Sequence, residues 1–456
     1  MERADLVLRD VRPFGGPVKD IAILDGRVAA VAPALPHLGP SLEGGGRDII
    51  PGLHDDHLHL FATAAQAESV DLSNLKTAND IRSALRSAVA AQNSSSWLRA
   101  TGLVEAAGAL PDRALLDEWV PDRPLRIQGR TGGLWLLNSA ALGKIGPPPW
   151  PDSVECDQMG QPNGRIWRGD EWLRHVIGGQ PPCLGNISRE LASYGITAVT
   201  DASSTNGPAE AKLFENAIAG GQLLQRLTLM GTENLPRSAM FDSGPLKLLY
   251  DENALPPLEA VISRIRSARD QGRSVAAHCV TLSELLFFLG ALREAGGAKM
   301  GDRIEHGSVV PQSLLPDIAK SGLKVVTQPD FVRTRGDRYL KTIESYEIPN
   351  LYRLKSLKNA GIAVAAGSDA PYGSMDPWSA IRSAIHRTTL DGQGFGQTEA
   401  LSTRQALALF LRSRHILPGM PADLCLLKRP ISHLAEHKGD SPIAMTFIAG
   451  HVIYEC

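Results

Sequence analysis

The chain has 456 residues, a formal net charge of −2 and 43% hydrophobic residues. It can bury a large core, and its balanced charge argues against nucleic acid or an anionic membrane surface as a partner. No apolar stretch is long enough to span a bilayer, and the N-terminus lacks the apolar core of a signal peptide. The five cysteines are scattered, which fits a reducing compartment. We therefore expect a cytoplasmic protein that acts on a small molecule.

Both ends of the chain have the pattern of β-strands. Residues 4–9, 20–31, 422–427 and 445–453 alternate between polar and apolar side chains, and Asp25-Gly26 is a typical hairpin turn. The pattern predicts the strands but not how they pair.

The run from Pro51 to Leu60 is typical of a buried strand that ends in two histidines. His57 and His59 are two residues apart, so on a strand their side chains point to the same face. Imidazole is a common ligand for zinc and similar metals. A single His-x-His is weak support for a metal site, and its weight depends on whether further ligands occur downstream in the chain.

Four more polar residues occur in or at the end of apolar runs. Lys247 lies within the run 244–250, and three other residues each end a predicted strand: His278, His306 and Asp369. A lone histidine at a strand end is usually a hydrogen-bonded structural residue. Four histidines together with a lysine and an aspartate, in this order, favour a binuclear metal site instead.

Short apolar runs alternate with amphipathic stretches such as 258–271 and 282–295, which predicts parallel strands joined by crossover helices. Eight strands are expected, near 51–57, 195–201, 225–231, 244–250, 274–279, 302–307, 324–329 and 363–369. Eight is the number in a TIM barrel, an α/β fold whose active sites lie at the C-terminal strand ends. The candidate ligands lie at those ends, except Lys247, which lies within its strand.

These motifs, in this order, resemble the amidohydrolase superfamily, in the branch related to N-substituted formamide deformylase (amidohydrolase 3, or YtcJ-like). The resemblance extends over nearly the whole chain and is most specific at Pro51–His59, Gly244–Lys247, Arg303–His306 and Gly367–Pro371. It implies a metal-dependent hydrolase TIM barrel formed by residues 51–415. Residues 1–50 and 416–456 would together form a small β-sandwich beside it.

The resemblance also implies a ligand set: His57, His59 and Asp369 on one divalent cation, His278 and His306 on a second, and Lys247 between them. Zinc is the expected metal. The lysine would carry CO2 as a carbamate, which is chemically reasonable because burial lowers the pKa of an amine. The implied reaction is hydrolysis of a C–N amide-type bond, as in an N-acyl or N-formyl amine, by a hydroxide that bridges the cations. Asp369 would act as general base and then as general acid.

About 130 residues separate the first predicted barrel strand from the second, which is too many for a loop. We expect an insertion at about residues 62–190, with helices near 78–92 and 137–144, that emerges on the catalytic face and could wall the pocket. Relatives often carry a histidine where this chain has Gly133, so their substrate cannot simply be transferred. Four residues of the insertion are candidates for substrate contact, although a role in its own core or surface turns is favoured for each: Trp135, Arg165, Trp167 and Arg168.

Other interpretations of single residues stay open. Lys247 could extend its amine to solvent, and Asp369 could cap the next helix along the chain. Asp55 shares the parity of His57 and could support the site, or could simply be buried with a backbone partner. Asp201, at the end of another predicted strand, is a further pocket candidate.

Two other classes of protein compete with the binuclear hydrolase. A mononuclear deaminase on the same barrel would lack Lys247 and would carry a glutamate where this chain has Thr281. A non-catalytic scaffold would be expected to lose ligands, whereas this chain keeps the full set. Carbamate, lactone and ester substrates, and a homo-oligomeric state, remain open.

Overall fold

Eight parallel strands form the central sheet of the computed structural model, which describes residues 3–91, 97–104, 110–130, 132–178, 181–436, 439 and 441–456. The order of the strands in the sheet follows their order along the chain: β5 (Leu53–Leu58), β12 (Ile196–Asp201), β13 (Arg226–Gly231), β14 (Asp242–Leu248), β15 (Val275–Cys279), β16 (Arg303–His306), β17 (Lys324–Thr327) and β18 (Ala363–Ala366). Each strand overlaps a predicted one, so the predicted TIM barrel is confirmed.

The barrel closes where the chain segment after β18 meets the end of β5. The backbone N–H of Asp369 donates to the carbonyl of His57 at 2.7 Å, and that of His59 donates to the carbonyl of Ala370 at 2.8 Å. Gly367 makes this approach possible, because a Cβ at this position would lie 2.5 Å from the backbone nitrogen of His57.

We expect Gly367→Ala to lower the free energy of unfolding by about 1–3 kcal/mol, because the added methyl group must displace backbone at the seam. Urea unfolding followed by circular dichroism would measure the change. Gly290→Ala is the matched control: Gly290 lies in helix α9 (Leu282–Glu294), and a Cβ there meets no atom within 4 Å. Equal stability of both variants would contradict the tight seam.

Helices join most of the barrel strands: α6 (Gly185–Ser193), α7 (Pro208–Ala219), α8 (Leu258–Asp270), α9, α10 (Leu315–Ser321), α11 (Asp330–Thr342) and α12 (Lys355–Asn359). Two more helices, α13 (Pro377–His386) and α14 (Thr403–Leu407), follow the last barrel strand. The two helices predicted at 258–271 and 282–295 are confirmed as α8 and α9. Residues 232–241, between β13 and β14, contain no helix, so this crossover differs from the regular strand–helix pattern. This link is short and contains Pro236, which disfavours a helix.

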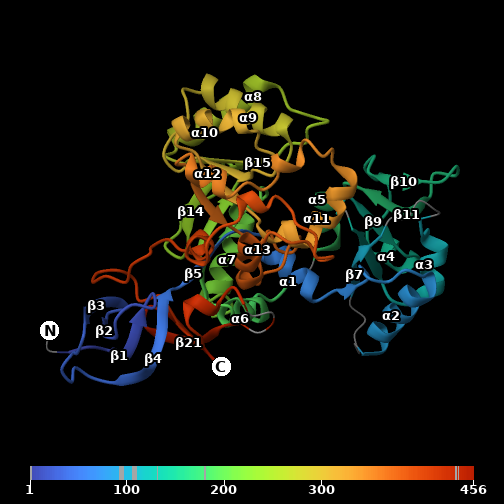
Figure 1. Cartoon of the computed structure of the whole chain (residues 1–456). Coiled ribbons are helices and arrows are strands. Elements are labelled where there is room, and N and C mark those ends of the chain that lie inside the picture. The colour runs from blue at the N-terminus through green and yellow to red at the C-terminus, as the bar shows by residue number, and fades with distance from the viewer. Residues whose placement is uncertain are drawn as a thin grey trace. The chain divides into compact units, whose positions relative to one another are not determined.

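Strands from both chain ends form one seven-stranded sheet in the order β21 (His451–Glu455), β20 (Ile443–Ile448), β19 (Leu424–Leu427), β4 (Ser41–Pro51), β1 (Leu6–Pro13), β2 (Lys19–Leu24) and β3 (Arg27–Ala32). Figure 1 shows these blue and red strands side by side. The sheet folds back on itself: a Cβ on Gly26, in the β2–β3 turn, would lie 3.0 Å from the Cβ of Ala449, in the β20–β21 turn. The predicted sandwich from both ends is therefore confirmed, while β4 was not predicted.

Residues Phe61–Cys183 form a separate compact unit, distinct from the unit of Met1–Leu60 with Leu184–Cys456. Its six-stranded sheet was not predicted: β10 (Val154–Cys156), β11 (Pro162–Trp167), β9 (Leu134–Leu137), β8 (Leu125–Gly129), β7 (Leu98–Leu103) and β6 (Val70–Asp71). Its helices include the predicted pair: α2 (Ala78–Ala91), α3 (Arg113–Trp119), α4 (Ser139–Leu142) and α5 (Asp170–Ile177), preceded by α1 (Leu60–Ala67). The exact limits of the predicted domains stay predictions. Within the described ranges, no helix is both long and apolar enough to cross a bilayer.

Candidate metal centre

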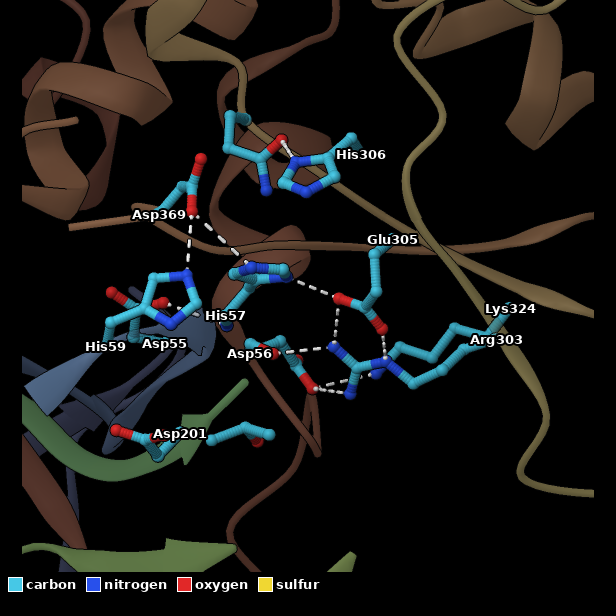
Figure 2. A network of polar contacts seen from close by, with 12 residues as sticks. Asp55, Asp56, His57, His59, Asp201, Arg303, Glu305, His306, Lys324 and Asp369 are labelled. Carbon is cyan, nitrogen blue, oxygen red and sulfur yellow. Dashed lines mark hydrogen bonds and ion pairs between the residues drawn. The ribbon is translucent and has the colours of Figure 1, made fainter. Parts of the chain in front are cut away.

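Three of the predicted ligands converge at the seam of the barrel. His57 and His59 come from the end of β5, and Asp369 follows β18. Nε2 of His57 and Nε2 of His59 lie 3.4 Å and 3.3 Å from the same oxygen of Asp369, Oδ1 (Figure 2). One nitrogen or oxygen of each residue lies within 4.8 Å of the others, so the three can share a cation.

The other three predicted residues lie on neighbouring strands. The ring of His306, on β16, lies 4.8 Å from that of His57 and 4.5 Å from that of His278, on β15, between ring centroids. Lys247 pairs with Ala276 across β14 and β15. Its amine is buried and has no hydrogen-bond partner among the described residues. Besides burial, a positive charge on Lys247 lowers the pKa values of His57, His278 and His306.

Three of the histidines have their Nδ1 atoms occupied, each by an oxygen. A histidine whose Nδ1–H donates to such an oxygen keeps the lone pair of Nε2 for a metal. The partners are Glu305 for His57, Ser203 for His59 at 3.0 Å and Gln328 for His306 at 3.0 Å.

Burial sets the protonation of the basic groups. It lowers the pKa of His57, of His306 and of Lys247, and it lowers the pKa of His278 to about 4, in each case because the interior disfavours the charged form. The rings are therefore neutral, and deprotonation of the amine is favoured. These are the forms in which imidazole binds a metal and an amine can add CO2.

Asp369 is held in its ionised form. Burial alone would raise its pKa, but the contact with His59 and the interactions with His306 and His57 bring the pKa below its usual value. Asp369 and His306 also adopt the left-handed backbone, with φ of 55° and 66°. This conformation costs a non-glycine residue about 1–3 kcal/mol and is concentrated at functional sites. Asp369 does not cap the next helix, because the N-cap of α13 is Asp376.

A buried chain of charges runs from His57 through the barrel interior (Figure 2). Glu305, fully buried, contacts Nδ1 of His57 and binds Arg303 through both carboxylate oxygens. Arg303 donates to the backbone carbonyl of Asp56 at 2.6 Å, and Lys324 lies 3.0 Å from the Asp56 carboxylate. The ion pairs balance the buried charges, as such groups require.

The role of Glu305 was not predicted, although its motif was. Glu305 and Arg303 are two residues apart on β16 and so lie on one face. A buried carboxylate next to a candidate ligand was the signal available in the sequence. Ser203 and Gln328 gave no such signal, because their contacts arise only when separate strand ends meet.

We expect Glu305→Gln to weaken zinc binding by about 10–100-fold, because the histidine loses the carboxylate that fixes its ring. Titration calorimetry of metal-free protein would measure the affinity. The control is Glu399→Gln, which removes another buried carboxylate that binds an arginine, Arg353, in this unit. Equal zinc affinity of wild type and Glu305→Gln would contradict the orienting role.

The two additional aspartates hold the backbone. Asp55 Oδ1 accepts from the backbone N–H of His57 at 3.1 Å and of Ser368 at 3.0 Å, so it joins the two segments of the seam. Burial raises its pKa to about 7. Asp201 accepts from the backbone N–H of Leu60 at 2.7 Å and of Ser203 at 3.1 Å. It thus positions the serine that contacts His59, while its role as a pocket residue stays a prediction.

The candidates in the insertion make contacts within their own unit. Trp135 is part of a core cluster, and Arg165 donates to the carbonyl of Leu110 at 2.7 Å. Trp167 donates from Nε1 to Glu155 at 2.9 Å, while the backbone of Arg168 donates to Gly133 at 2.7 Å. Contact between these residues and a substrate stays a prediction.

Comparison with known proteins decides the family. A profile of the amidohydrolase family matches residues 45–454. The chain belongs to the amidohydrolase family. As an amidohydrolase it is a metal-dependent hydrolase with a small-molecule substrate.

Individual relatives of this amidohydrolase are distant. The Bacillus subtilis protein YtcJ is 26% identical over 90% of this chain and 89% of its own length. The N-substituted formamide deformylase of Arthrobacter pascens is 23% identical over 91% of this chain and 90% of its own. The crystal structure of an uncharacterized metal-dependent hydrolase from Pyrococcus furiosus shares the fold, with a TM-score of 0.74, 19% identity and coverage of 94% of this chain and 99% of that one.

Proposed function

We propose that this amidohydrolase cleaves a C–N amide-type bond, such as that of an N-acyl or N-formyl amine, with two divalent cations. The observation that carries the proposal is the convergence of His57, His59 and Asp369 within 4.8 Å, with the Nδ1 atoms of both histidines occupied. The relative named as an N-substituted formamide deformylase supports the choice of bond.

Lys247 supports a second cation. A buried amine without a hydrogen-bond partner is costly, and described residues offer Lys247 none. A carbamate on its Nζ would replace this orphaned group with an anionic ligand that bridges two cations. His57, His59 and Asp369 would hold the first cation, His278 and His306 the second, and zinc is the metal that this set of nitrogen and oxygen donors suits best.

When bound, the cations polarise the scissile carbonyl and acidify a water molecule. Glu305 and Ser203 keep the rings of His57 and His59 in the tautomer and orientation that ligation needs. Asp369, ionised and next to both rings, takes the proton of the attacking water. It then delivers this proton to the amide nitrogen, which leaves only as a protonated amine.

The first experiment is to measure the metal content of protein expressed with zinc and bicarbonate, together with hydrolysis of N-formyl and N-acyl amines. We expect about two equivalents of metal, as in two-metal hydrolases, and release of free amine. His57→Ala should lose metal and turnover yet keep the circular dichroism of the folded barrel. Undiminished turnover by His57→Ala would refute the assignment.

A mononuclear deaminase is the second candidate, because the three converging residues suffice for one cation. One equivalent of metal, with ammonia released from an aminated heterocycle, would favour it. The position that would hold its glutamate is used otherwise: Thr281 caps α9 by accepting from the backbone of Glu284 at 3.2 Å. A chain that binds no metal even after reconstitution would instead be a scaffold.

A further inference from the structure

Arg335, on α11, holds its guanidinium in a fixed position between Phe331 and Tyr372. Its Cζ lies 3.4 Å from the centroid of the Phe331 ring, and Phe331 is buried. Its Nη2 donates to the backbone carbonyl of Tyr372 at 2.9 Å. Stacking on an aromatic ring fixes the plane of the guanidinium, and the backbone hydrogen bond fixes its rotation.

Within the described part of the chain, no carboxylate neutralises Arg335. The two acids of its own helix bind elsewhere. Asp330 accepts from Arg333 at 3.2 Å and from Ser379 at 2.8 Å, and Asp337 accepts from the backbone of Asp391 at 3.1 Å. A guanidinium has five N–H groups, so Arg335 keeps donors for a ligand.

The segment that Arg335 contacts also carries Asp369. The backbone N–H of Tyr372 donates to the carbonyl of Asp369 at 2.8 Å, and the Tyr372 ring lies 6.0 Å from the ring of His59, between centroids. Tyr372 is 56% exposed. Arg335 is thus one residue removed from two of the predicted metal ligands, at the C-terminal end of the barrel, where substrates of this fold bind.

We propose that Arg335 binds a carboxylate of the substrate, and that the substrate is an N-acyl or N-formyl amine that carries a carboxylate, such as an N-acylated amino acid. A planar guanidinium with free N–H groups matches a carboxylate in a two-point contact, and its fixed position reduces the entropy lost on binding. The exposed ring of Tyr372 would lie beside the chain between the amide and the carboxylate. This inference rests on the proposed function, which supplies the amide bond.

The test compares racemic N-formylphenylalanine with N-formyl-2-phenylethylamine, which lacks only the carboxylate. A charged hydrogen bond contributes about 1.5–3 kcal/mol, so we expect the zinc-loaded wild type to favour the acid by about 10–100-fold in kcat/KM. Arg335→Met should abolish this preference, mainly through KM, and leave the neutral substrate within about twofold. Arg335→Lys, which keeps the charge and most of the packing, should retain part of the preference.

The matched control is Arg338→Met, which removes an exposed arginine that stacks on Tyr339 one turn further along α11. It should keep the preference for the acid. Equal use of both substrates by the wild type, or an equal loss for both in Arg335→Met, would overturn the proposal.

If neither substrate is cleaved, calorimetric binding to the zinc-loaded protein separates the two proposals. Binding of the acid alone, lost in Arg335→Met, would support the carboxylate site while refuting deformylation of these amides. Equal binding of both compounds, or of neither, would overturn the carboxylate site itself.

Discussion

Replacing Lys247 with methionine should stabilise the metal-free protein and at the same time abolish hydrolysis. The amine is buried and has no hydrogen-bond partner among the described residues. Removing such a group while keeping a side chain of similar length should raise the free energy of unfolding by about 1–3 kcal/mol. The same change removes the proposed bridge between the two cations, so turnover should fall to background and metal content from about two equivalents to one or none.

Urea unfolding of chelated protein and elemental analysis of reconstituted protein would measure the two effects. Lys324→Met is the control, because Lys324 also lies on a barrel strand but is paired with the buried Asp56. It should lose stability and keep its metal. A destabilised Lys247→Met protein that still binds two equivalents would show that the lysine has another role.

Asp369→Asn should reduce kcat by about 100- to 10,000-fold, the usual contribution of a general acid–base group. An amide can still occupy the space next to His57 and His59, but it cannot accept a proton from water. Because the carboxylate oxygen also lies 3.3–3.4 Å from both histidine Nε2 atoms, we expect weaker metal binding as well. Single-turnover assays at saturating zinc would separate the chemical step from the loss of metal.

Asp376→Asn provides the comparison for this variant. Asp376 caps α13 by accepting from the backbone of Trp378 at 2.8 Å, and asparagine is an equally good N-cap. It should therefore retain activity. A catalytic rate for Asp369→Asn within tenfold of wild type at full metal occupancy would exclude the acid–base role.

The sequence was most informative where the whole pattern lies within a single strand. His57 and His59 are recognisable because their spacing matches the strand period, and the barrel strands are recognisable as apolar runs between amphipathic helices. The resemblance supplied the remaining ligands and the pairing of the two chain ends.

The features that the sequence did not reveal depend on contacts between distant segments. Ser203 and Gln328 meet their histidines only when the strand ends come together, and Arg335 looks like any other cation on an amphipathic helix. The sheet of the insertion was missed for a related reason: some of its strands are short, and neither two-residue nor three-residue strands leave a periodic pattern.

The closure between β5 and the segment after β18 imposes an order on the maturation of this protein. His57 and His59 are among the first residues of the barrel to leave the ribosome, whereas Asp369 is made only after seven further barrel strands. A nascent chain that ends before Asp369 has neither the third ligand nor the hydrogen bonds that tie Asp369 to His57 and Ala370 to His59. High-affinity metal binding by His57, His59 and Asp369 should therefore begin only once the barrel is complete. A bound metal would then indicate that the barrel has finished folding.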